Sequence, residues 1–305
     1  MTGATGFLGR RLTSALAVAG WRVRVLVRKP ADATWTDPRP EVIAGDLGDR
    51  SALERLVSGA QVVIHGAGLI KARDRAAFFA ANAKGAEHLA AVAGEGDGRM
   101  ILVSSLAARS PELSDYAASK RAGEMAALAV LGDRLMVVRP PAIYGPGDRE
   151  TLGLFKLAAA SPVVPMPDDP ATRLALTYVD DVAAHLVEAV GAGWAPGVFA
   201  LGGARPEGYG WREIFTEAAV AMGRAPALAP IPPWVIRAAA SVSETAGSLR
   251  GSPAIFNRGK ARELLHRDWS VTDGELPPEP RGPWLDLPTG FARTVAWYRS
   301  AGWLT

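Results

Sequence analysis

Two hydrophobic patterns alternate along the first two-thirds of the chain. Short apolar segments with a period of two cover residues 21–28, 41–45, 61–65, 100–103, 135–139 and 198–201, and segments with a helical period cover residues 10–20, 52–57, 78–93, 116–131 and 181–190. A period of two indicates strands, and a period of 3.6 indicates helices. Steady alternation of the two predicts an α/β fold with a doubly wound parallel sheet and right-handed crossovers.

A glycine-rich turn precedes the first predicted helix. Gly3, Gly6 and Gly9 are spaced three apart, and the strand expected over 21–28 follows the helix. Such glycines let the backbone turn tightly and approach a pyrophosphate, while the helix N-terminus faces the anion. The glycine turn together with the following strand predicts a βαβ dinucleotide-binding unit.

A tyrosine and a lysine are placed to act together. Tyr116 and Lys120 are four residues apart on a predicted helix, so both side chains lie on one face. A tyrosine hydroxyl ionises near pH ~10, and a nearby ammonium favours the phenolate that acid/base catalysis requires. Ser105 follows the strand 100–103, where open α/β sheets bind their ligands. Ser104 is the competing assignment, because one residue's shift along a strand reverses the face.

With these motifs the chain resembles the extended branch of the short-chain dehydrogenase/reductase superfamily, whose members are epimerase/dehydratase-like proteins with a Rossmann-type fold. The matching segments are residues 2–9, 45–47, 65–68, 82–85, 105–120, 139–147 and 178–183. The chain departs from the family pattern at two positions, because Gly68 replaces the second residue of a paired alanine and Tyr178 replaces a histidine.

The resemblance implies a set of site residues. It assigns catalysis to Ser105, Tyr116 and Lys120, with Ser105 binding the substrate oxygen and Tyr116 transferring a proton. Asn82 would order water or backbone near the site, or make structural bonds only. The cofactor-binding residues expected from the motifs and from the strand ends are Gly3, Thr5, Gly6, Phe7, Leu8, Arg28, Asp46, Leu47, Gly66, Ala67, Gly68, Tyr116, Lys120, Pro140 and Ile143.

The end of the second strand bears on the choice of cofactor. An acidic residue there would bond the adenosine 2′-hydroxyl of NAD, whereas Arg28 and Lys29 can pair with the 2′-phosphate of NADP. We therefore favour NADP and keep NAD as the alternative. Asp46 is expected to border the adenine, or else to cap the helix that begins near Ser51.

The patterns also suggest a domain organisation. We expect a dinucleotide-binding domain of residues 1–150, to which 174–202 return, and a smaller, mostly helical substrate domain formed by 151–173 and 203–305. The Pro-rich segment 161–167 marks the clearest change of pattern. A strand normally leads into the glycine turn, yet only Met1 precedes Thr2, so we expect the first strand to be missing from this chain and its start to lie upstream.

Composition excludes several functional classes. The 305 residues include no cysteine, which excludes disulfides and thiolate metal sites, and the four histidines lack metal-ligand spacing, so no metal is expected. A net charge of +3 with dispersed arginines indicates no nucleic-acid partner. No apolar run resembles a signal peptide or a membrane span, so we expect no membrane partner and a cytoplasmic location. A homodimer is left open.

We expect an NAD(P)-dependent oxidoreductase that moves a hydride to or from a small carbonyl or secondary alcohol. The short loop 106–115 weakens a sugar-nucleotide substrate, although an NAD-dependent sugar epimerase or dehydratase remains the first alternative. A non-catalytic NADPH-binding regulatory or structural subunit is the second. Arg149 and Arg173 could meet a substrate anion or form surface ion pairs, and the substrate itself stays undetermined.

Overall fold

The computed structural model of the chain forms two compact units. It describes residues 1–30, 35, 39–160, 162–167, 169–249, 256–278 and 283–304. Unit 1 comprises Met1–Pro140, Val182–Ala200 and Pro277–Arg281, and unit 2 comprises Pro141–Asp181, Leu201–Leu276 and Gly282–Thr305.

Unit 1 is built on parallel strands. These are β1 (Arg24–Val27), β2 (Glu41–Ala44), β3 (Val62–His65), β4 (Arg99–Val103), β5 (Leu135–Arg139) and β10 (Gly197–Ala200). β10, β5, β4 and β3 pair in that order, and β1 pairs with β2. Between the two groups, the Leu26 amide donates to the Met1 carbonyl at 3.0 Å and the Thr2 amide donates to the Ile64 carbonyl at 2.9 Å. Met1 and Thr2 therefore bridge β1 and β3, and the described residues contain no longer strand at this place.

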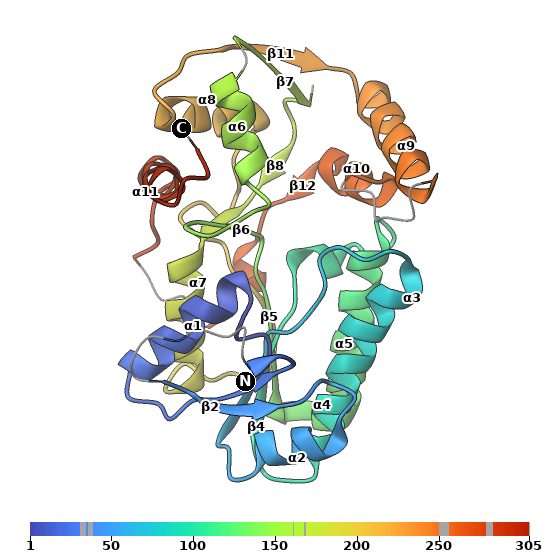
Figure 1. Ribbon diagram of the computed structural model, residues 1–305, viewed down its shortest axis with the longest axis vertical. Coiled ribbons are helices and arrows are strands. Elements are labelled where there is room, and N and C mark those ends of the chain that lie inside the picture. The colour runs from blue at the N-terminus through green and yellow to red at the C-terminus, as the bar shows by residue number, and fades with distance from the viewer. Residues whose placement is uncertain are drawn as a thin grey trace. The chain divides into compact units, whose positions relative to one another are not determined.

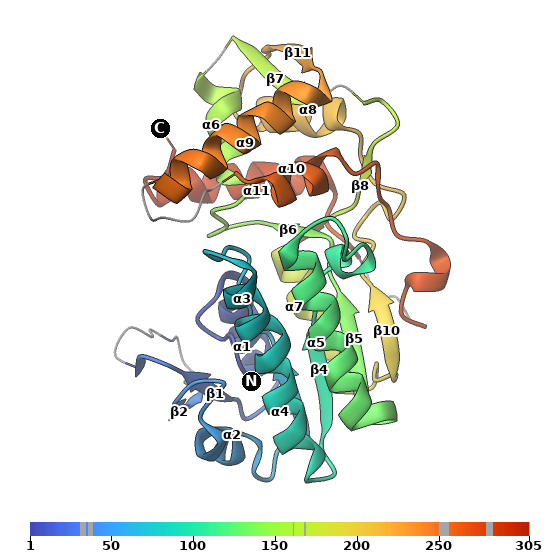
Figure 2. The same cartoon turned by 90° about the vertical axis from the view of Figure 1, so that its right-hand side faces the viewer.

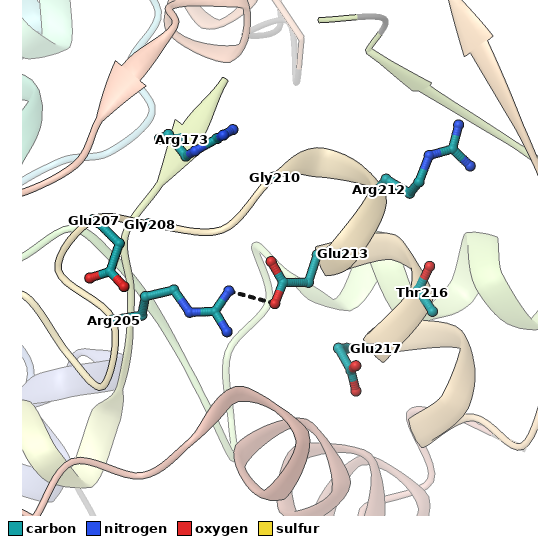
Figure 3. A pocket seen from close by; sticks show the side chains of 9 residues that line it. All are labelled: Arg173, Arg205, Glu207, Gly208, Gly210, Arg212, Glu213, Thr216 and Glu217. Carbon is teal, nitrogen blue, oxygen red and sulfur yellow. Dashed lines mark hydrogen bonds and ion pairs between the residues drawn. The ribbon is translucent and has the colours of Figure 1, made fainter. Parts of the chain in front are cut away.

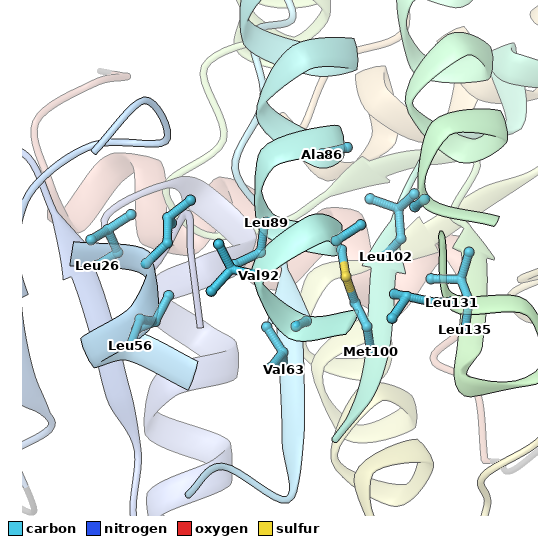
Figure 4. Packing of buried hydrophobic residues seen from close by; sticks show 14 of the residues in the cluster. Leu26, Leu56, Val63, Ala86, Leu89, Val92, Met100, Leu102, Leu131 and Leu135 are labelled. Atoms are coloured by element: carbon cyan, nitrogen blue, oxygen red, sulfur yellow. The ribbon is translucent and has the colours of Figure 1, made fainter. Parts of the chain in front are cut away.

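Helices cover both faces of this sheet (Figures 1 and 2). The helices of this part of the chain are α1 (Phe7–Val18), α2 (Arg50–Val57), α3 (Arg75–Phe78), α4 (Gly85–Gly94), α5 (Asp115–Leu131) and α7 (Val179–Val190). α4 and α5 lie on one face, and α1 and α7 lie on the other. Buried side chains of α2, α4 and α5 pack against alternate residues of β1, β3, β4 and β5, among them Leu26, Val63 and Met100 (Figure 4). The doubly wound parallel α/β fold is confirmed.

The predicted helix over residues 78–93 is present, but it is not a regular α-helix throughout. The chain forms α3, then a π-helical segment Phe79–Lys84, and then α4. Wider π turns hold an extra residue and displace the backbone locally. Here the Asn82 carbonyl approaches α5 so closely that a Cβ at Gly123 would lie 2.6 Å from it. Close packing of the two helices therefore accompanies the irregular turn.

Within its described residues, unit 2 combines five α-helices with three short pairs of parallel strands. Its helices are α6 (Leu152–Ala160), α8 (Trp211–Ala221), α9 (Pro233–Leu249), α10 (Arg258–Leu265) and α11 (Leu287–Ser300). Its strands are β6 (Ala142–Tyr144), β7 (Val163–Pro167), β8 (Arg173–Leu174), β9 (Leu176–Tyr178), β11 (Ala227–Ile231) and β12 (Asp268–Trp269). β6 pairs with β9, β7 with β11, and β8 with β12. Buried aromatic rings form its core, with Phe291 contacting Phe155 at 5.0 Å and Tyr144 at 5.1 Å between centroids.

The limits of the two units differ from the expected domain limits. Residues 141–150 and 174–181, expected in the dinucleotide-binding domain, belong to unit 2. Pairing of β6 with β9 joins both segments within that unit. The Pro-rich segment 161–167, which was expected to mark a boundary, contributes β7 to the same unit.

Candidate active site

The glycine turn of unit 1 is closely packed. Gly3 has a φ of +76°, which favours glycine, and a Cβ there would lie 2.4 Å from the carbonyl carbon of Gly66. A Cβ at Gly9 would lie 2.0 Å from the Gly3 oxygen. Gly6 caps α1 without a side-chain hydrogen bond, so no side chain caps the first amides of the helix. Such a helix end is suited to binding an anion.

The segment after β3 lies directly beside this turn. The Gly66 amide donates to the Thr2 carbonyl at 3.2 Å, and the Ala67 amide donates to the Thr2 hydroxyl at 3.3 Å. His65 is buried, with its Nδ1 2.7 Å from the same hydroxyl, and burial lowers its pKa to about 3, so the ring is neutral. The structure thus brings Thr2 and Gly3 of the glycine motif together with Gly66 and Ala67. Thr5, Phe7 and Leu8 follow the turn at the start of α1.

α5 carries the tyrosine and the lysine near its N-terminus. Ser114 caps this helix by accepting the Ala117 amide at 3.0 Å, which places Tyr116 in the first turn. The Tyr116 ring is half-buried and lies 6.1 Å from the Phe78 ring, between centroids. Lys120 donates from Nζ to the Val103 carbonyl at 2.9 Å, which holds its ammonium at the end of β4. Burial lowers the pKa of Lys120 to about 8, and the Glu124 carboxylate opposes that shift.

The two serines after β4 occupy different environments. Ser105 begins a short 3₁₀ helix (Leu106–Arg109), and its hydroxyl accepts the Ala107 amide at 3.2 Å. Ser104 is buried and donates to Glu124 Oε1 at 2.5 Å. Because the Ser104 hydroxyl donates its hydrogen to this carboxylate, it cannot also donate to a substrate. The geometry therefore favours Ser105 as the serine that could bind a substrate.

Glu124 is a buried charge that sequence analysis missed. Arg139 binds both of its carboxylate oxygens, at 2.8 and 2.6 Å, and Arg121 approaches Oε2 at 3.2 Å. The Glu124 side chain is 3% exposed and that of Arg139 is 12% exposed. This network connects α5 to the ends of β4 and β5, one helical turn after Lys120. In the sequence, Glu124 is an ordinary polar position of a helix, so only a long-range contact could have identified it.

Asn82 connects the segment after β3 to α5. Its Oδ1 accepts the Leu69 amide at 2.7 Å, and its Nδ2 donates to the Leu69 carbonyl at 3.0 Å and to the Ser119 hydroxyl at 2.9 Å. Ser119 in turn donates to the Tyr116 carbonyl at 2.8 Å. The Asn82 side chain therefore orders the backbone of Leu69 next to Gly68, which agrees with the first of the two roles raised from the sequence.

Three residues expected near the adenosine lie at the ends of β1 and β2. Arg28 is exposed just after β1 and makes no ion pair within the described part of the chain. Asp46 accepts the Gly48 amide at 2.8 Å, whereas Asp49 caps α2, so the alternative that Asp46 caps this helix is wrong. Leu47 packs so closely against Gly85 that a Cβ there would lie 2.6 Å from Leu47 Cδ1.

The remaining predicted residues lie elsewhere in the two units. Pro140 is buried at the end of unit 1, where its carbonyl accepts the Leu106 amide at 2.8 Å, and Ile143 lies in β6 of unit 2. Arg149 lies over the Trp303 ring at 5.2 Å. Arg173 donates to the carbonyls of Pro170 and Thr172 at 2.9 Å.

Unit 2 contains an open cavity of about 750 Å³ that Arg173 helps to line (Figure 3). Three arginines and three glutamates surround it, and Arg205 donates to Glu213 at 2.6 Å across it. Because the two signs of charge are equal in number, the cavity shows no preference for an anion. The substrate anion considered for Arg173 gains no support here.

Residues 1–202 match the NAD-dependent epimerase/dehydratase family. The chain belongs to that family. A ceramide reductase from Caulobacter vibrioides is 50% identical to this family member over 305 residues, covering 100% of this chain and 95% of the relative. A (4-alkanoyl-5-oxo-2,5-dihydrofuran-3-yl)methyl phosphate reductase from Streptomyces griseus is 29% identical, covering 90% of this chain and 97% of the relative. Among solved structures, a UDP-glucose 4-epimerase from Thermus thermophilus, in complex with NAD, has the same fold, with a TM-score of 0.70 at 22% identity and 98% of both chains covered.

Family membership makes the chain an NAD(P)-dependent oxidoreductase or epimerase of the extended short-chain type. Within the described residues, no three His, Asp or Glu side chains are grouped to hold a metal ion. In the same part of the chain, no helix has the length and apolarity that crossing a membrane requires.

Proposed function

We propose that this enzyme reduces a ketone of a ceramide-like lipid to a secondary alcohol with a nicotinamide cofactor. The observation that carries the proposal is the 50% identity with a ceramide reductase along the whole chain. Ceramide itself carries a secondary alcohol beside a carbon that bears an acylated nitrogen. A hydride reductase that forms this alcohol needs the matching ketone, which takes a hydride from NAD(P)H on carbon and a proton on oxygen. The substrate is then larger than the small carbonyl expected from the sequence.

The residues of unit 1 have distinct roles in this proposal. The cofactor supplies the hydride. Ser105 donates a hydrogen bond to the ketone oxygen, and Tyr116 transfers its proton to that oxygen. Lys120, held at the Val103 carbonyl, favours the phenolate that remains. The glycine turn and the uncapped start of α1 would hold the pyrophosphate.

NADPH is the cofactor that we propose. Arg28 is exposed after β1 with Lys29 beside it, and neither is engaged by an ion pair among the described residues. A guanidinium can bind a 2′-phosphate through two hydrogen bonds, whereas NAD offers only a hydroxyl at this position.

The decisive experiment measures NADPH oxidation by the purified chain with a long-chain α-acetamido ketone, and identifies the alcohol product by mass spectrometry. We expect stoichiometric loss of NADPH and ketone. Tyr116→Phe should lower kcat by at least ~100-fold with an NADPH dissociation constant within about twofold of the original, because the change removes only a proton-transfer group.

Each alternative gives a different result. An epimerase or dehydratase would retain unchanged NAD through its turnover and would consume no added NADPH. A non-catalytic subunit would bind NADPH without oxidising it on any ketone. Normal turnover by the phenylalanine variant would disprove the acid/base role of Tyr116.

A further inference from the structure

Gly68 lies beside the lysine of the candidate site, and Leu69 and Ile70 follow it in the chain. A Cβ at Gly68 would lie 3.7 Å from Lys120 Nζ and 3.0 Å from Asn82 Oδ1. The next residue, Leu69, is fixed through both backbone groups to the Asn82 side chain, at 2.7 and 3.0 Å. Asn82 is 3% exposed and also binds Ser119, one turn from Tyr116. The segment is therefore held in a defined position beside the tyrosine and the lysine.

The two side chains that follow Gly68 are apolar and exposed. Leu69 is 38% exposed and Ile70 is 57% exposed. A single exposed leucine needs no explanation, but adjacent exposed apolar side chains beside a polar reaction centre indicate a surface that binds an apolar group. The nearly buried ring of Phe78, which contacts Tyr116, adds a further apolar group on this side of the tyrosine.

We propose that Leu69 and Ile70 bind the alkyl chain attached to the ketone carbon and so set the preference for long-chain substrates. The inference rests on the proposed function and names a specificity site for it. An alkyl chain is the fitting occupant because Asn82 and Ser119 link this segment to the helix turn that carries Tyr116, and the two side chains that it exposes are apolar. Burying successive methylenes against two apolar side chains makes binding stronger with chain length.

The test compares α-acetamido ketones that carry butyl, octyl or dodecyl chains, using NADPH oxidation to obtain kcat/KM. For the original enzyme we expect kcat/KM to rise at least ~10-fold from butyl to dodecyl, where a tenfold change corresponds to ~1.4 kcal/mol. In the double variant Leu69→Ser/Ile70→Ser, kcat/KM for the dodecyl ketone should fall about tenfold, while the value for the butyl ketone stays within about twofold.

Val220→Ser is the matched control, because Val220 is an apolar residue that is 63% exposed on α8 of unit 2. It should leave all three values unchanged. NADPH affinity and the thermal midpoint of the double variant are measured in parallel, and we expect both to stay close to those of the original chain, because neither residue belongs to the buried core.

Four results would overturn the inference. Equal losses on the butyl and dodecyl ketones would show that the segment supports the site without binding the chain. A changed oligomeric state with an unchanged chain-length profile would assign the two residues to contact with a second copy. Reduction of all three ketones with equal kcat/KM would refute the inference alone, whereas reduction of none would refute the proposed function together with it.

Discussion

At the scale of single residues, Lys120 is held between opposing influences. Burial favours its neutral form and brings its pKa from 10.5 to about 8, although Glu124 on the same helix favours the charged form. His65, whose pKa is lowered by burial and by the Lys120 charge, is neutral above a pH of about 3. The ammonium that the reaction requires is therefore present below pH 8 and is lost above it.

The loss of the Lys120 charge above pH 8 predicts how the rate of reduction depends on pH. We expect kcat/KM to be level below a pH of about 8 and to fall as the pH rises further, because Lys120 then loses its proton. Measurement of NADPH oxidation across this range gives the profile. Lys120→Arg is the control, because a guanidinium stays charged there, so any activity that it retains should lack this fall.

Unfolding would not mimic this loss of activity. The folded-state pKa of Lys120 lies below the unfolded value of 10.5, so the buried ammonium costs stability below pH 8, and that cost disappears as the pH rises towards 10.5. The contribution of this group to stability therefore increases where activity decreases. A parallel fall of stability and activity above pH 8 would contradict the assignment.

At the scale of elements, the Glu124 network determines how α5 sits against β4 and β5. Removing the carboxylate leaves the nearly buried Arg139 guanidinium without its partner. Breaking such a pair costs ~3–5 kcal/mol, whereas replacing both charges by apolar groups is often close to neutral. Glu124→Leu should therefore lower the free energy of unfolding by about that amount.

The double variant Glu124→Leu/Arg139→Leu should recover most of this loss. Urea unfolding of both single variants and the double variant measures the coupling. Additive losses would mean that the two residues do not stabilise the chain as a pair. The double variant also lacks the carboxylate that favours the charged form of Lys120. The pKa of Lys120 should therefore be lower in this variant, and its activity should begin to fall at a lower pH than that of the original chain.

Hydrophobic period was enough to locate the main elements of unit 1. It predicted the strands β1 to β5 and β10. The glycine spacing predicted a tight turn, and in the structure neighbouring backbone atoms leave no room for a side chain at Gly3 or Gly9. The hydrophobic period did not reveal the π-helical turn around Asn82, because that turn arises where α5 packs closely. The bond from Asn82 to Leu69 was equally hidden, since a loop that contacts a helix leaves no periodic signal.

At the scale of the whole molecule, the strands of unit 2 were the hardest to foresee. β7 and β11 contain prolines, and β8 and β12 have two residues each, so neither pair has the apolar alternation of a sheet strand. In the sequence, the prolines of β7 predict a domain boundary rather than a strand. Parallel pairing of segments far apart in the sequence depends on the packed unit, which sequence pattern alone does not describe.

Cofactor binding should stabilise the entire chain, because a ligand that binds only the folded state shifts the folding equilibrium. NADPH at a hundred times its dissociation constant contributes ~2.7 kcal/mol, and 1 kcal/mol moves the midpoint of a domain of ~150–250 residues by ~2–4 °C. We therefore expect NADPH to raise the thermal midpoint by several degrees and NADH at equal concentration to raise it less.

Arg28→Asp should remove most of the NADPH shift and spare the NADH shift, because an aspartate repels the 2′-phosphate and can bond a 2′-hydroxyl. Scanning fluorimetry of both proteins with both cofactors is the measurement. Equal losses with the two cofactors would assign Arg28 a role other than choosing between them.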